Sequence, residues 1–201
     1  RRLRTAATGR VRLGMIDVAA VTHFPDVLRA FRAEQNDVDL TLSVAPSRAL
    51  LSDLKSGALD LAVCVEPTTP IHGITTISLL SEQLLVYGPP GVTLGPPATW
   101  GPWVLFPAGS HTRHAVTTSL AARGAPLDVV AESHQPDVLR EMVLLGLGWT
   151  VLPRSQGELG NLELTVGEQI TKRRLVLARR RDAITDPAVD ELGDRLLHRR
   201  N

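Results

Sequence analysis

Cysteine is nearly absent from this sequence, and the one present lies in an apolar segment. Cys64 is the single cysteine among 201 residues, which excludes a disulfide framework and favours a reducing compartment. Because its neighbours are apolar, a buried core thiol is favoured over a catalytic nucleophile. The six histidines show neither His-x-x-x-His spacing nor pairing with cysteine, so we expect no metal site and no cofactor.

A strong charge of one sign is also missing. Lysine and arginine number 22 and aspartate and glutamate 21, which leaves a formal net charge of +1. A nucleic-acid-binding domain usually has a basic face, so this balance argues against direct DNA binding by these residues. Arginines gather at residues 1–12, 173–181 and 195–200, where solvated surfaces and a frayed end are favoured over a nucleic-acid surface.

Long apolar runs are missing as well. No run approaches the roughly 20 residues that a membrane-spanning helix needs, so we expect no membrane association and a cytoplasmic location. The arginines near the start are not followed by the apolar core of a secretory signal. Residues 1–8 are interpreted as a linker remnant, which predicts that the sequence is part of a longer chain.

The strongest local pattern is the stretch 55–66, where a helix ends and a buried strand begins. Leu50, Leu51 and Leu54 recur at helical spacing, and Gly57 suits the positive φ that often ends a helix. The run 59–65 is apolar except for one aspartate. It is typical of a strand covered on both faces, as in a parallel sheet.

A strand–helix–strand–helix–strand pattern precedes residue 66. Such alternation predicts a parallel sheet with right-handed crossovers. The elements are a strand at 11–16, a loop at 17–21, a helix capped by Thr22 with Pro25 in its first turn, an alternating strand at 38–44 and a helix capped by Ser47.

A second α/β series follows a passage that we place near Ser81. Glycine and proline at 88–97 exclude regular structure there. The apolar stretch 74–87 before it is interrupted by polar residues 81–83. Later elements are strands at 103–106, 127–131, 149–153, 162–166 and 174–178, helices at 111–123 and from Pro136, and a last helix begun by Asp186 and Pro187.

The last helix is assigned to the first unit, because that unit otherwise has only two helices for its sheet. We therefore expect a linker at 1–8, subdomain I at 9–80 and 178–201, and subdomain II at 81–177. Paired domains of this kind bind small ligands in the cleft between them.

A catalytic site is not evident. Gly109-Ser110-His111 does not match the G-x-S-x-G of a nucleophile elbow. Gly146 and Gly148 follow a helix instead of a strand and lack the third glycine of a dinucleotide loop. We therefore expect a binding protein and not an enzyme.

Helix N-termini are the remaining candidates for a site, because their free N–H groups attract anions. Hydroxyls at Ser47, Ser110 and Thr112, with Arg113 nearby, would suit a carboxylate. An equally supported alternative is that Ser47 and Ser110 only cap their own helices. For His114 and His134 taken singly a surface position is favoured, and for Trp149 a core position.

At this point the sequence resembles the effector-binding domain of LysR-type transcriptional regulators. Each matching segment is weak alone, but the ordered set spans nearly the whole chain. The segments are Val11-Arg12-Leu13-Gly14, Phe24-Pro25-x-x-Leu28-x-x-Phe31, Val38-Asp39-Leu40-Thr41-Leu42, Leu54-x-x-Gly57-x-Leu59-Asp60-Leu61-Ala62-Val63, Leu84-Leu85-Val86 and Met142-Val143-x-x-Gly146-x-Gly148-x-x-Val151-Leu152-Pro153.

The resemblance implies an α/β protein with a type 2 periplasmic-binding-protein-like fold, in which two crossover segments join two Rossmann-like subdomains. It implies a small-molecule effector bound between the subdomains and control of transcription. DNA would be bound only through a winged helix-turn-helix that precedes this sequence. A homodimer or homotetramer is implied, formed through the helices at 23–35 and 111–123, where Ala30, Val116 and Leu120 would lie in the contact.

Carried over by position, the effector pocket of the family falls on seven residues. The loop 17–21 has no hydroxyl, and an acidic Asp17 disfavours a nearby carboxylate, so acidic, neutral and cationic effectors all stay open. The alternatives are a solute-binding protein of a transporter, which shares the fold, and an enzyme built on paired α/β domains. The pocket residues are Val18, Ser47, Ser110, Thr112, His114, His134 and Trp149.

Overall fold

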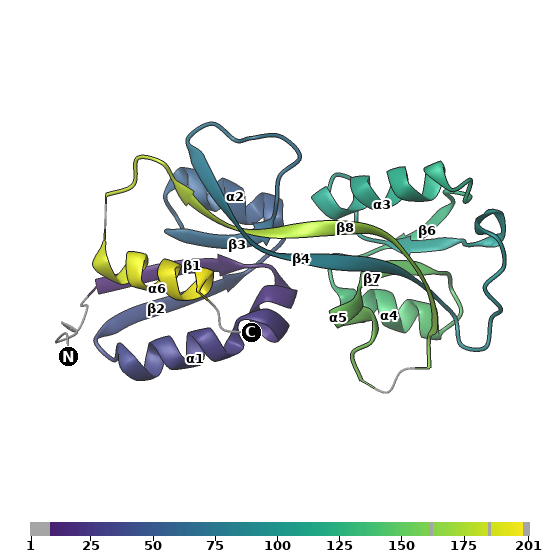
Figure 1. Ribbon diagram of the computed structural model, residues 1–201, viewed down its shortest axis with the longest axis horizontal. Coiled ribbons are helices and arrows are strands. Elements are labelled where there is room, and N and C mark those ends of the chain that lie inside the picture. The colour runs from purple at the N-terminus through teal and green to yellow at the C-terminus, as the bar shows by residue number, and fades with distance from the viewer. Residues whose placement is uncertain (1–8, 161–162, 185, 199–201) are drawn as a thin grey trace. The chain divides into compact units, whose positions relative to one another are not determined.

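The computed structural model describes residues 9–160, 163–184 and 186–198 (Figure 1). The predicted linker at 1–8 lies outside these residues. The chain divides into two compact units, each with its own hydrophobic core. Unit 1 comprises Arg1–Leu80 and Leu175–Asn201, and unit 2 comprises Ser81–Arg174.

The sheet of unit 1 is built on strand β1 (Gly9–Met15). It pairs in parallel with β2 (Val38–Val44) on one side and with β3 (Leu61–Val65) on the other. On its far side, β3 pairs antiparallel with the end of β8 (Thr165–Arg180). The parallel arrangement that the sequence predicted for the first three strands is therefore confirmed.

Helices cover both faces of this sheet. Helix α2 (Ser47–Ser56) packs on β3 and β1, whereas α6 (Pro187–Leu197) packs on β1 and on α1 (Pro25–Glu34). A Cβ atom at Gly14 would meet Leu50 of α2, so the face of Gly14 is the α2 face. Leu13 points to the opposite face, because neighbouring strand residues alternate. The prediction that the last helix packs on the first sheet is confirmed.

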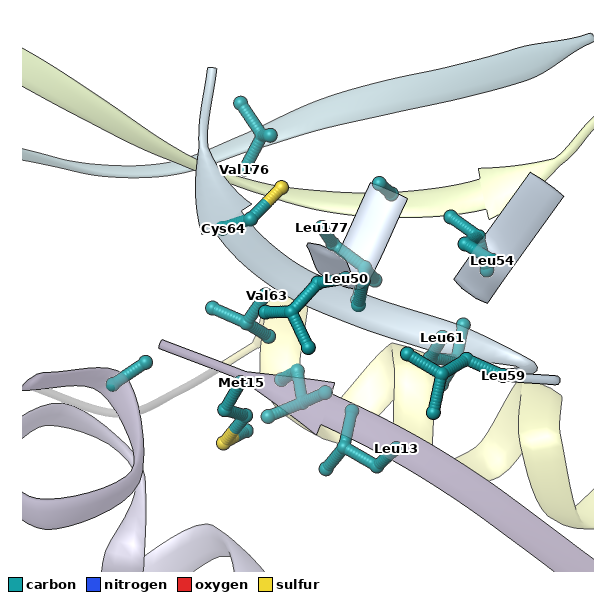
Figure 2. Packing of buried hydrophobic residues seen from close by; sticks show 14 of the residues in the cluster. Leu13, Met15, Leu50, Leu54, Leu59, Leu61, Val63, Cys64, Val176 and Leu177 are labelled. Atoms are coloured by element: carbon teal, nitrogen blue, oxygen red, sulfur yellow. The ribbon is translucent and has the colours of Figure 1, made fainter. Parts of the chain in front are cut away.

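The core of unit 1 is one cluster contributed by all these elements, and Figure 2 shows part of it. Side chains of Leu13 and Met15 from β1 meet those of Leu61 and Val63 from β3. Cys64 has no exposed surface, as predicted, and burial raises the pKa of its thiol to about 12. A thiol held neutral in this way is not a nucleophile at physiological pH.

The predicted loop at 17–21 is wrong, because these residues are helical. A π-helical turn, η1 (Ala19–His23), forms here, and the N–H of Phe24 donates to the carbonyl of Ala19 at 2.9 Å. Thr22 lies within this turn and caps nothing, whereas Pro25 occupies the first turn of α1 as predicted. Burial of Val18 and Ala19 in the core favours the compact turn over an open loop.

Unit 2 contains two sets of paired strands. The second half of β4 (Ile74–Gly88) pairs antiparallel with β7 (Thr150–Pro153), and β5 (Trp103–Leu105) pairs in parallel with β6 (Val129–Glu132). Its helical elements are η2 (Pro97–Thr99), α3 (His111–Ala122), α4 (Pro136–Leu144) and the short α5 (Arg154–Gly157), which the sequence did not predict.

Strands β4 and β8 each run from one unit into the other. The sequence predicted an interruption of β4 at 81–83 and two separate strands in place of β8, one of which began at residue 162, outside the described residues. Both interruptions are wrong, because Glu82 and Arg173 are buried within the strands and pair with each other. A charged side chain that is paired with an opposite charge can stay buried, so neither Glu82 nor Arg173 has to interrupt its strand.

Candidate functional site

In unit 1 the candidate site lies at the carboxyl ends of the three parallel strands. The ends of parallel strands share one edge of a sheet, which is where open α/β sheets bind ligands. Val18 follows β1, and Ser47 follows β2 and begins α2. The N–H of Val65, the last residue of β3, donates to Oγ of Ser47 at 3.0 Å. This bond joins the start of α2 to the end of β3.

Ser47 does not cap its helix, so that prediction is wrong. Pro46 occupies the cap position, and its side chain has no group that can accept a hydrogen bond from the first helical N–H groups. The hydroxyl of Ser47 accepts from Val65 instead, because the end of β3 lies beside it. Among the described residues none accepts a hydrogen bond from this hydroxyl, so its O–H remains a donor.

Val18 contributes no exposed side chain to this edge. Its side chain is 1% exposed and belongs to the core of unit 1. Its N–H donates to Oδ1 of Asp17 at 2.7 Å, which holds the carboxylate close to the backbone of the turn.

In unit 2 the corresponding edge is formed by the carboxyl ends of β5 and β6. Ser110 caps α3 as predicted, since its Oγ accepts from the N–H of Arg113 at 3.0 Å. The guanidinium of Arg113 donates to the carbonyl of Phe106 at 2.7 Å and to Oε1 of Glu132 at 2.8 Å. The hydrogen bond from Arg113 also holds the pKa of Glu132 below its usual value. One arginine therefore joins the ends of both strands to the first turn of α3.

Thr112, in the same turn, is tied to a buried ion pair. Its residue surface is 4% exposed, and its Oγ1 accepts from Nη1 of Arg173 at 3.1 Å. Nε of Arg173 donates to Oε2 of Glu82 at 2.6 Å. The sequence grouped Arg173 with solvated arginines, and this is wrong, because its side chain is 7% exposed. The available signal was the polar segment 81–83 inside the apolar stretch 74–87, whereas nothing in the sequence sets Arg173 apart from the lysine and arginine beside it.

The two histidines lie on the surface. His134 follows β6, beside the edge that Ser110 borders, because the N–H of Ser133 donates to the carbonyl of Leu105 at 3.1 Å. His114 is exposed on α3, one residue beyond Arg113. Unit 2 thus brings Ser110, Thr112 and His134 to one edge.

Trp149 is not part of that edge. It is 8% exposed, belongs to a core cluster of unit 2 and stacks on Trp100 with ring centroids 6.4 Å apart. Its N–H donates to the carbonyl of Pro102 at 2.7 Å, which precedes β5. Ser110 follows β5, so the two residues lie toward opposite ends of that strand.

Two further properties concern the described part of the chain. It holds no group of three or more histidine, cysteine, aspartate or glutamate side chains that could bind a metal ion. Within the same residues, no helix is both long and apolar enough to cross a membrane.

The family described as the LysR substrate binding domain matches residues 4–201. The chain belongs to this family. Its α/β fold is therefore the type 2 periplasmic-binding-protein-like fold, as predicted. The family is regulatory and not enzymatic, and the alternative of a transporter's solute-binding protein is not favoured.

Individual relatives agree with this assignment. The uncharacterized HTH-type transcriptional regulator YfeR of Shigella flexneri is 23% identical over 197 residues, which is 93% of this chain and 64% of that protein. The cofactor-binding domain of the Cbl transcriptional regulator superposes with a TM-score of 0.84 at 18% identity, covering 100% of this chain and 94% of that one. The effector-binding domain of QuiR in complex with shikimate gives 0.80 at 18% identity, covering 95% and 96%.

Proposed function

We propose that this chain is the ligand-sensing domain of a transcriptional regulator in the LysR family. A small-molecule effector binds at the strand edges described above, and a winged helix-turn-helix that precedes this sequence binds DNA. The family membership supports this function, and so does the relative named as an HTH-type transcriptional regulator. Unit 1 acts as subdomain I and unit 2 as subdomain II of a cytoplasmic protein, with the return crossing before Leu175 instead of after residue 177, where the sequence placed it.

One observation carries the proposed ligand chemistry. Ser47, Ser110 and Thr112 each accept a hydrogen bond from a donor within the protein, at 3.0, 3.0 and 3.1 Å. A hydroxyl has one O–H donor, so each oxygen that accepts from the protein still has its proton to donate. At either edge, donors of this kind suit an effector with acceptor oxygens, such as a carboxylate, a carbonyl or a hydroxyl group. The QuiR relative is solved with shikimate, which carries such groups.

The remaining pocket residues have supporting roles in the proposal. His114 and His134 are exposed and offer ring nitrogens to a ligand at the unit 2 edge. Val18 and Trp149 are buried in the cores of their own units and are not proposed to contact the effector. No cofactor takes part.

The proposed assembly is a homodimer that uses α1 of one subunit and α3 of its partner, with a homotetramer as the larger assembly. Val116 and Leu120 cannot form the apolar strip that the sequence predicted, because both are buried in the core of unit 2. Ala30 on α1 and Ala121 on α3 are exposed and small enough for close helix approach. Ala30→Asp should therefore give a monomer in sedimentation at micromolar concentration, and a monomeric unmutated chain would contradict the dimer.

A thermal-shift screen tests the proposed function. Small hydroxy acids, aromatic acids and amino acids are compared with cationic amines of similar size. A ligand at 100 times its Kd stabilises the native state by about 2.7 kcal/mol, which gives a clear rise in melting temperature. We expect hits among compounds with acceptor oxygens. Hits confined to the amines would overturn the proposed ligand chemistry, and a panel without hits up to millimolar concentration would count against a small-molecule sensor.

A further inference from the structure

A buried ion pair lies where both linking strands enter unit 2. Glu82 is the second residue of unit 2 on β4, and Arg173 is the last residue but one of unit 2 on β8. Their side chains are 4% and 7% exposed, with Nε of Arg173 2.6 Å from Oε2 of Glu82. Because β4 and β8 are neighbouring strands, the pair cross-links them at this level.

The pair also reaches two helices. Nη1 of Arg173 donates to the hydroxyl of Thr112 in the first turn of α3, and the hydroxyl of Ser155 in α5 lies 3.4 Å from Oε1 of Glu82. Four elements of unit 2 therefore meet at one arginine and one glutamate. Thr112 is two residues from Ser110, so the network begins at the proposed binding edge.

Burial makes this arrangement energetically demanding. Two charges removed from water lose more hydration than their attraction restores unless the remaining hydrogen-bonding groups are also satisfied. Apolar side chains of similar size would hold the strands together without that penalty. The feature that an apolar pair could not supply is a directed hydrogen bond to Thr112, since an apolar side chain has no N–H group to donate to the hydroxyl oxygen.

We propose that Arg173, oriented by Glu82, is the positioning residue for the binding edge of unit 2. It holds Thr112 and the first turn of α3 against β4 and β8, and so links that turn to the two strands by which the chain passes into unit 1. This inference rests on the proposed function for its biological meaning. Its physical content, a coupling between Thr112 and the strands, holds without any ligand.

Hydrogen–deuterium exchange on the ligand-free chain tests the coupling. Thr112→Val removes the hydroxyl and keeps the shape of the side chain. A hydrogen bond to a charged group contributes about 1.5 kcal/mol, so we expect amides at 81–84 and 172–175 to exchange about tenfold faster. The amides of β5 and β6 should keep their rates, because a general loss of stability would raise all of them together.

A matched control lies on the same helix. The hydroxyl of Thr117 donates to the carbonyl of Arg113 at 3.0 Å, within α3. Thr117→Val should therefore leave exchange in β4 and β8 unchanged. Thr112→Ser keeps a hydroxyl at this position, so its strand amides should exchange at the rates of the unmutated chain. Unchanged strand exchange in Thr112→Val would overturn the inference.

A second variant covers the case in which Thr112→Val does not fold. Arg173→Lys keeps the charge beside Glu82 and loses the planar fork that reaches Thr112. We expect faster exchange at the first turn of α3 in this variant, and an unaltered turn would contradict the positioning role. Because no ligand is added, a failed effector screen and a failed coupling experiment remain distinguishable.

Discussion

The two units hold their candidate binding edges by different physical means. In unit 1 the hydroxyl of Ser47 is fixed by a neutral backbone amide, that of Val65. In unit 2 the first turn of α3 is fixed by two guanidinium groups, those of Arg113 and Arg173. Hydrogen bonds from charged donors are about twice as strong as neutral ones, so the edge of unit 2 is the more strongly preorganised half. Unit 1 relies on the packing of one continuous core.

The largest expected effect comes from breaking the buried pair of unit 2. Arg173→Met leaves the carboxylate of Glu82 buried without its cation, which should lower the free energy of unfolding by about 3–5 kcal/mol. The double variant Glu82→Met, Arg173→Met removes both charges and should recover most of that loss. Urea unfolding of the unmutated chain, the single variant and the double variant measures both effects. Equal losses in the single and double variants would show that packing, not charge, is what Arg173 supplies.

Gly148 and Gly14 differ in what an added Cβ atom would meet, which is rigid backbone at Gly148 and movable side chains at Gly14. A Cβ at Gly148 in unit 2 would lie 2.6 Å from the carbonyl oxygen of Pro102, which belongs to the backbone. A Cβ at Gly14 in unit 1 would lie 2.5 Å from Cδ1 of Leu59 and 2.6 Å from Cδ2 of Leu50, which are the far ends of side chains and can shift. We expect Gly148→Ala to cost about 3 kcal/mol and Gly14→Ala about 1 kcal/mol in thermal or urea unfolding. The reverse order would contradict this distinction.

Acid should weaken unit 1 through Asp60. Burial raises the pKa of this carboxyl, but hydrogen bonds from Arg12 outweigh it and hold the pKa below its usual value. A depressed folded-state pKa contributes stability above the unfolded value of about 3.9, and this is lost as the pH falls through the folded value.

The matching variants isolate that contribution. Asp60→Asn should lower stability at neutral pH by about 1 kcal/mol, and should flatten its decline in acid. Asp39 of β2 pairs with Arg10 of the neighbouring strand β1, but both side chains are mostly exposed, 60% and 69%. Asp39→Asn should therefore change stability little at any pH. Similar pH profiles for the two variants would remove Asp60 as the cause.

The smallest expected effect concerns ligand binding at Ser47. Ser47→Ala should weaken binding of the strongest ligand from the screen by roughly 0.5–1.5 kcal/mol, the net value of one hydrogen bond. Ser56→Ala is the control, because its hydroxyl donates to the carbonyl of Asp53 within the same helix. Calorimetric titration compares the two. Equal affinities would leave Ser47 with only the structural bond to Val65.

Features encoded by a few adjacent residues were predictable. Gly57 ends α2 with a φ of 84°, and Asp186 caps α6 by accepting from the N–H of Ala188 at 2.8 Å. The parallel order of β1, β2 and β3 followed from alternating elements and the fully apolar run of β3. In each case the cause lies within one turn or one strand, where propensity and periodicity act directly.

Bonds between distant residues were beyond local patterns. Ser47 reads as a helix cap, yet its acceptor oxygen is used by Val65, 18 residues away, because the chain brings β3 beside it. Arg173 reads as a surface arginine, yet Glu82, 91 residues earlier, makes its burial tolerable. A buried polar side chain forms its hydrogen bond with a group that the folded chain places beside it. Such pairings therefore depend on how whole helices and strands pack, and not on residues adjacent in the sequence.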